Sequence, residues 1–151
     1  MAPKIEFSLD NVWLGFGTLH GLARLESDAI VFEVQTQDNV FNVVKSPVSE
    51  IRLSFSDIEK ASFSNGFFGF FASLTITGHS LAAMQNIPGA KQRSLTVDIA
   101  RKARPEAREF VSQINLIISE QMLKRELNMP AAEMLPSQSS LHREDDRQRV
   151  H

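Results

Sequence analysis

Residues 105–127, PEAREFVSQINLIISEQMLKREL, form the stretch on which the fold prediction depends, because they predict one long helix. Pro105 suits the first helical position, where its missing N–H would have no partner, and Pro130 prevents continuation past Asn128. Apolar residues recur at intervals of three and four: Ala107, Phe110, Val111, Ile114, Ile117, Ile118 and Met122. Because such a stripe is buried against another element, we expect the helix to pack on the structure that the preceding residues form.

The residues before the helix alternate between apolar and polar side chains, which is typical of strands. Asn65-Gly66 is a strong hairpin signal, because both residues tolerate positive φ. Residues 1–11 predict an irregular entry, residues 26–28 a turn, and residues 81–87 either a strand or a helical turn. Strands are expected over residues 12–25 with a bend at the glycines, 30–35, 40–45, 51–56, 57–64, 67–77 and 95–99.

About seven strands followed by one helix predict a mainly β fold. The expected architecture is a strongly bent antiparallel sheet, or open barrel, that the C-terminal helix caps. Residues 1–128 would form a single domain. Residues 129–151 lose all periodicity and are rich in Pro, Ser, Gln and charge, so they predict a flexible polar tail.

The composition places the chain among ordinary globular proteins, with 151 residues, 42% hydrophobic and 23% charged. A net charge of −2 argues against nucleic-acid binding, which normally requires a basic excess. The absence of cysteine excludes disulfides and thiolate metal sites. Neither a signal-peptide pattern nor an apolar run of membrane-spanning length is present, so a cytoplasmic protein is expected.

Four stretches carry a resemblance to a known family: GTLHGLARLESDAIVFE (17–33), EIRLSFSDIEKASFSNGFFGFFASLTI (50–76), SLTVDIA (94–100) and REFVSQI (108–114). They resemble the pleckstrin-homology-like superfold, in particular its GRAM-type and bacterial members, over roughly residues 12–127. The resemblance implies a PH-like domain over residues 1–128. Its lipid-binding members have clustered Lys and Arg at the turn between the first two strands. Here that turn is expected at Glu26-Ser27-Asp28, where only Arg24 is basic, so inositol-phosphate binding in that mode is not expected.

The stretch FSNGFFGFF, residues 63–71, holds five of the chain's 11 phenylalanines. A single strand cannot bury both of its faces in one core. Either one pair of rings fills the barrel and the other lies under the tail or a loop, or the rings form an exposed patch that docks a partner.

Three leucines lie roughly opposite the buried stripe of the helix. They are single surface residues, or a contact for a folded-back tail, or a surface for a helix of a second copy or a partner. The predicted partner interface is therefore Phe67, Phe68, Phe71, Leu116, Leu123 and Leu127.

A basic run precedes the helix and enters its first turn. It predicts an anion site, because a helix N-terminus carries free N–H groups and partial positive charge. The alternative is a solvated connection whose arginines pair with Glu106 and Glu109. The candidate residues are Arg101, Lys102, Arg104 and Arg108.

No catalytic residue, metal site or cofactor is predicted. His20 and His79 stand alone, His142 and His151 lie in the tail, and no catalytic or phosphate-binding motif is present. The expected function is a non-enzymatic interaction module that binds a protein partner or a second copy of itself. The first alternative is binding to an anionic membrane surface at the basic run, and the second is a small ligand inside the barrel.

Overall fold

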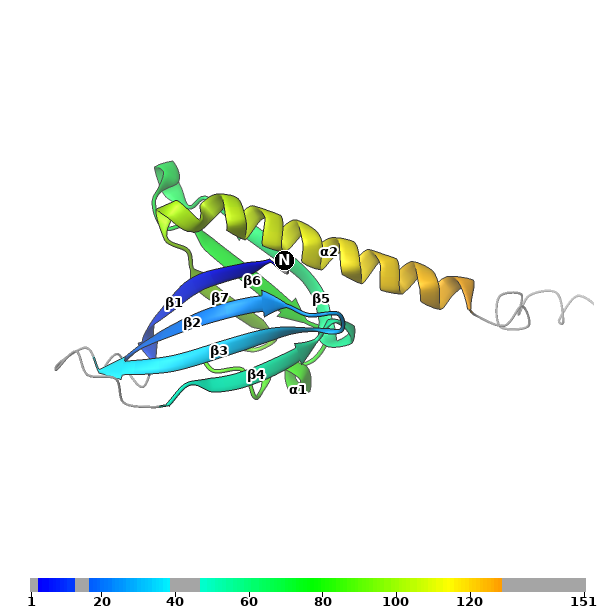
Figure 1. Cartoon of the computed structure of the whole chain (residues 1–151), viewed down its shortest axis with the longest axis horizontal. Coiled ribbons are helices and arrows are strands. Elements are labelled where there is room, and N and C mark those ends of the chain that lie inside the picture. The colour runs from blue at the N-terminus through cyan, green and yellow to red at the C-terminus, as the bar shows by residue number, and fades with distance from the viewer. Residues whose placement is uncertain (1–2, 13–16, 39–46, 129–151) are drawn as a thin grey trace, which may run out of the picture. The chain divides into compact units, whose positions relative to one another are not determined.

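The computed structural model describes residues 3–12, 17–38 and 47–128 (Figure 1). Its strands are β1 Lys4–Val12, β2 Gly17–Leu25, β3 Ala29–Asp38, β4 Ser49–Ser54, β5 Ile58–Ser64, β6 Ser73–Gly78 and β7 Ser94–Asp98. Its α-helices are α1 Leu81–Met84 and α2 Arg104–Leu127, and its 3₁₀ turns are η1 Phe55–Asp57, η2 Phe67–Gly69 and η3 Arg101–Ala103. The chain falls into two units, one ending at Ser119 and one beginning at Glu120, and the sheet belongs to the first unit.

The seven described strands form one antiparallel sheet in the order β4-β3-β2-β1-β7-β6-β5. Strands β4 and β5 follow each other in the chain but lie at opposite edges, so the sheet is not closed. Figure 1 shows β1–β4 crossing in front of β5–β7. The predicted mainly β fold, with an antiparallel sheet and one long C-terminal helix, is confirmed.

The start of α2 packs on the sheet through the predicted stripe. Phe110 and Ile114 are fully buried in the same cluster as Phe55, Leu53 and Ile76. Ala107, Val111 and Ile118 are also buried. The stripe differs from the prediction at two positions, because Ile117 is only partly buried and Met122, which belongs to the second unit, is exposed.

The free edge of β5 is covered by a side chain of α2. Asn115 Nδ2 donates to the carbonyl oxygen of Ala61 at 2.9 Å, and the Ala61 N–H donates to Asn115 Oδ1 at 3.0 Å. An unpaired edge invites pairing with another chain, and an unpaired buried backbone group is destabilising. The asparagine therefore substitutes for a neighbouring strand at this position.

The prediction for the start of the chain was wrong. The irregular entry predicted for residues 1–11 is instead strand β1, whose Ile5 and Phe7 are buried while Lys4 and Glu6 are exposed. Since β1 precedes β2, the turn at residues 26–28 joins the second and third strands instead of the first two. The strand predicted over residues 40–45 lies outside the described residues.

The hairpin after β5 also differs from the prediction. The expected strand over residues 67–77 begins only at Ser73, and residues 67–71 form a loop. Positive φ angles at Phe68, Gly69 and Phe71 are incompatible with an extended strand, so the loop is longer than a two-residue turn. The ambiguous stretch 81–87 contains α1, which Ser80 caps by accepting the N–H of Ala83.

Candidate functional site

The phenylalanine loop, residues 65–72 between β5 and β6, exposes all four of its rings. Phe67 is 79% exposed, Phe68 90%, Phe70 62% and Phe71 85%. The expectation that one pair would fill the barrel is therefore wrong. The reason is that the pair was assigned to a strand, whereas the turn η2 directs these residues away from the core.

The backbone of this loop is strained. Phe68 has φ 51° and Phe71 has φ 60°, in the left-handed region, which costs a non-glycine residue about 1–2 kcal/mol. Gly66, with φ 71°, is required, because a Cβ there would lie 1.7 Å from the Phe70 carbonyl oxygen. The Phe70 N–H closes the turn by donating to the Phe67 carbonyl at 2.9 Å. Left-handed backbone at non-glycine residues is unfavourable and clusters at functional sites, which makes this loop a candidate.

The basic start of α2 lies against the loop. Arg104 Nη2 donates to the carbonyl oxygen of Gly69, and Arg108 Nη2 donates to Asn65 Oδ1 at 2.7 Å. The Arg108 guanidinium carbon also lies 5.3 Å from the centroid of the Phe63 ring. The phenylalanines and the basic run, which the sequence presents as two separate candidates, therefore form one surface. Sequence reasoning missed Asn65 and Gly69, because hydrogen bonds across 43 and 35 residues leave no local pattern.

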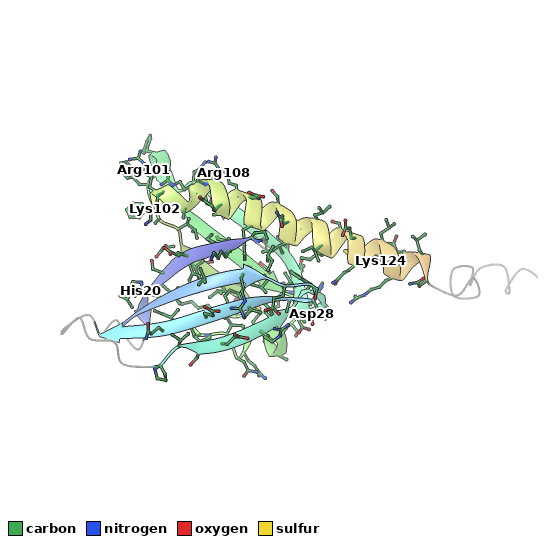
Figure 2. The ribbon with its side chains drawn as sticks, in the orientation of Figure 1. His20, Asp28, Arg101, Lys102, Arg108 and Lys124 are labelled. Carbon is green, nitrogen blue, oxygen red and sulfur yellow. The ribbon has the colours of Figure 1, made fainter. Side chains whose placement is uncertain are left out.

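The remaining two cations of the basic run point to solvent. Arg101 and Lys102 are exposed in η3, and neither forms a hydrogen bond or ion pair with any other described residue. Figure 2 shows both beside Arg108 at the start of α2. Within the described ranges, no arginine of the run pairs with Glu106 or Glu109, so the predicted internal pairing is wrong. An open groove of about 420 Å³ lies between the loop and this run, lined by Phe70, Phe71, Asp98, Arg101 and Arg104 among others.

The three leucines of the predicted interface are exposed, but they do not all belong to the same unit. Leu116 lies in the first unit and is 58% exposed, on the same helix as the buried Ile114. Leu123 and Leu127 lie in the second unit and are exposed there. The loop and Leu116 can therefore be considered together as surfaces of the first unit.

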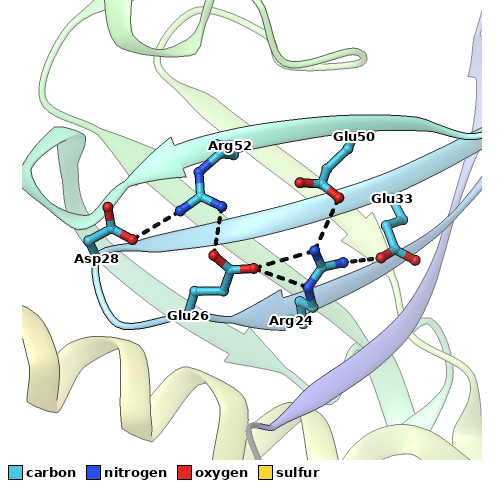
Figure 3. Close-up of polar contacts among 6 residues, drawn as sticks. All are labelled: Arg24, Glu26, Asp28, Glu33, Glu50 and Arg52. Atoms are coloured by element: carbon cyan, nitrogen blue, oxygen red, sulfur yellow. Dashed lines mark hydrogen bonds and ion pairs between the residues drawn. The ribbon is translucent and has the colours of Figure 1, made fainter.

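The turn at residues 26–28, where no lipid-binding cluster is expected, lies beside a group of ion pairs (Figure 3). Arg24 pairs with Glu26, Glu33 and Glu50, and Arg52 pairs with Glu26 and Asp28. Because three carboxylates already surround Arg24, its guanidinium is not available to an incoming phosphate. The turn between the first two strands falls at residues 13–16, outside the described residues.

The ion pairs of Arg24 and Arg52 predict one pH dependence. The hydrogen bond from Arg52, at 2.6 Å, is the main cause that lowers the pKa of Glu26 from its ordinary 4.5. A lowered folded-state pKa stabilises the fold above the unfolded pKa, and this contribution is lost as pH falls through the folded pKa. Arg52→Gln should therefore raise the pKa of Glu26 toward the ordinary value, as measured by NMR titration of its carboxyl carbon. Arg93→Gln, which removes the partner of Glu59 instead, is the control and should leave Glu26 unchanged. An unaltered Glu26 titration in Arg52→Gln would contradict the assignment.

Outside the phenylalanine loop and the basic run, the described residues form no evident catalytic or metal-binding group. Every described residue that is buried is apolar or glycine. No three His, Asp or Glu side chains among the described residues are grouped as around a metal ion. His20, exposed on β2 (Figure 2), lines an open groove of about 500 Å³ with Glu6, Glu33 and other residues. No helix in the described part of the chain is both long and apolar enough to span a membrane.

Comparison with known proteins finds no matching family model, no matching curated protein and no matching solved structure. The pleckstrin-homology-like resemblance therefore stays a prediction. The function must be argued from the geometry of the phenylalanine loop and its basic neighbours.

Proposed function

We propose that this chain is a non-enzymatic docking module that attaches to an anionic membrane surface. Its docking surface consists of the phenylalanine loop and the basic start of α2. The observation that carries the proposal is the contact of Arg104 with Gly69 and of Arg108 with Asn65, which joins four exposed rings and four cations.

The exposed rings supply the apolar part of this surface. A contiguous apolar patch on a globular protein marks a site of interaction with a protein or a membrane. Phe67 and Phe68 pack edge to face at 5.3 Å, so their rings act as one wedge in place of two separate side chains. A short loop that carries such rings can enter the boundary between headgroups and acyl chains.

The charge of the surrounding residues favours a lipid surface as the occupant. Residues 101–109 carry four basic and two acidic side chains, in a chain whose net charge is −2. The positive charge is thus concentrated beside the rings. Each Lys or Arg near an anionic leaflet contributes about 1 kcal/mol of attraction, which reinforces the apolar contact.

Vesicle co-sedimentation tests this function. The protein should bind vesicles of equimolar phosphatidylcholine and phosphatidylserine at low salt, and should bind pure phosphatidylcholine more weakly. Arg101→Ala with Lys102→Ala should weaken binding by about 2 kcal/mol, or about 30-fold, and high salt should remove most of that difference. The matched control is Lys91→Ala with Arg93→Ala, which removes two cations outside the basic run. No binding of the wild-type protein to anionic vesicles at low salt would reject the proposal.

Self-association or docking to a protein partner is the second candidate. It is supported by Leu116, which is exposed on α2 and belongs to neither the loop nor the basic run. Light scattering on concentrated protein should then show an assembly that Leu116→Glu disrupts. A protein that stays monomeric and binds vesicles favours the membrane, and one that assembles and ignores vesicles favours this candidate.

A further inference from the structure

We infer that Arg104 and Arg108 are positioning residues, which hold the phenylalanine loop in its docking form, and that Arg101 and Lys102 are the cations that face the anionic surface. The inference rests on the proposed function and divides its basic run into two roles. Arg104 and Arg108 contact the loop, whereas Arg101 and Lys102 are exposed.

Arg104 is directed to the loop and is only partly exposed. Its Nη2 donates to the Gly69 carbonyl, and its Nε is buried without a hydrogen-bond partner among the described residues. A buried donor without a partner is unfavourable, so the hydrogen bond from Nη2 to the Gly69 carbonyl has to offset part of that cost. A guanidinium in this position has part of its donor set unavailable to an external anion.

Arg108 holds the other end of the loop. One turn further along α2, it donates to Asn65 Oδ1 at 2.7 Å and covers the ring of Phe63. The two acceptors, Asn65 and Gly69, flank Gly66, Phe67 and Phe68. The two arginines thus form a two-point clamp, defined by the pairs Arg104–Gly69 and Arg108–Asn65, around Phe67 and Phe68, the latter being the most exposed of the four rings.

The clamp stabilises a strained loop conformation. Phe68 and Phe71 occupy left-handed backbone conformations that phenylalanine disfavours. Two hydrogen bonds from charged donors contribute about as much as two left-handed residues cost. Without the clamp, the loop should relax to conformations in which the rings no longer project together.

Arg101 and Lys102 do not hold the loop. They are exposed, and they form no hydrogen bond or ion pair in the described part of the chain. Their charge is available to a lipid phosphate. Removing either should change the salt dependence of docking and leave the loop unaltered.

Two sets of variants separate the roles. Asn65→Ala removes one acceptor of the clamp with no change in net charge, and Asn65→Asp keeps an acceptor oxygen. Arg104→Ala and Arg101→Ala each remove one positive charge, one from the clamp and one from the free pair. Two measurements are made on each: amide hydrogen exchange of residues 66–70 without lipid, and binding to the equimolar phosphatidylcholine and phosphatidylserine vesicles across salt concentrations.

We expect variants of the clamp and variants of Arg101 and Lys102 to differ in both measurements. Asn65→Ala and Arg104→Ala should speed exchange at the Phe70 amide by about tenfold, while Arg101→Ala and Asn65→Asp leave it unchanged. Asn65→Ala should weaken vesicle binding about tenfold with an unchanged salt slope, whereas Arg101→Ala should weaken it only at low salt. Equal melting temperatures across the set would show that the effect is local.

The inference is overturned if Asn65→Ala leaves loop exchange unchanged, or if Arg104→Ala and Arg101→Ala behave alike in both measurements. Failure of the proposed function gives a different result, because the wild-type protein would then not bind vesicles. Loop exchange without lipid would still report on the clamp in that case.

Discussion

Replacing Phe68 and Phe71 by Asn should abolish docking and leave the fold as stable as before, or more so. Asn enters the left-handed region more readily than Phe, so each substitution should leave stability unchanged or raise it by up to about 1 kcal/mol. Burying a phenylalanine ring contributes about 1.5–3 kcal/mol, so losing two rings should weaken vesicle binding by at least about 100-fold. Vesicle binding and chemical denaturation measure the two effects separately.

The matched control for this prediction is Leu81→Asn. Leu81 is also a strongly exposed apolar residue, but it lies in α1, at the end of the first unit opposite the phenylalanine loop in Figure 1. Its replacement should leave vesicle binding unchanged. If Phe68→Asn with Phe71→Asn bound vesicles like the wild type, the loop would not be the docking surface. If the same variant lost several kcal/mol of stability, the rings would be needed by the fold after all.

Phe110→Ala should be among the most destabilising single substitutions on α2, by about 3–5 kcal/mol. Phe110 is fully buried between the helix and the sheet, and its removal leaves a cavity that the surrounding strands cannot close. Urea denaturation followed by circular dichroism measures the change. The control is Leu116→Ala on the same helix, which should change stability by no more than about 0.5 kcal/mol because Leu116 is exposed.

A small effect of Phe110→Ala would mean that α2 contributes little to holding the sheet. The position of the basic run beside the phenylalanine loop depends on that packing, since Arg104 and Arg108 precede and flank the buried Ala107 and Phe110. The prediction therefore tests the support of the proposed docking surface as well as the fold.

Strand prediction succeeded where one face of a strand is exposed to solvent and the other face is buried. The alternation of residues 51–56 and 95–99 correctly places β4 and β7. It failed where the chain departs from regular structure without a local signal. The pattern of Phe67 to Phe71 fits an extended strand as well as a loop, and only the left-handed backbone of the folded chain decides between them. Strand β1 was missed although Ile5 and Phe7 alternate with polar residues and although it pairs with β2, the next strand in the chain, as well as with the distant β7.

The amino-acid sequence by itself determined that this chain forms strands followed by one helix, because side-chain periodicity of two and of 3.6 residues is a local property. It also predicted all five buried residues of α2, which are Ala107, Phe110, Val111, Ile114 and Ile118, but it wrongly added Met122 to them. Only the tertiary structure decided that the phenylalanine loop and the basic run form one surface. That surface depends on hydrogen bonds from Arg104 and Arg108 to residues far back in the chain, and no local pattern of residues encodes such contacts.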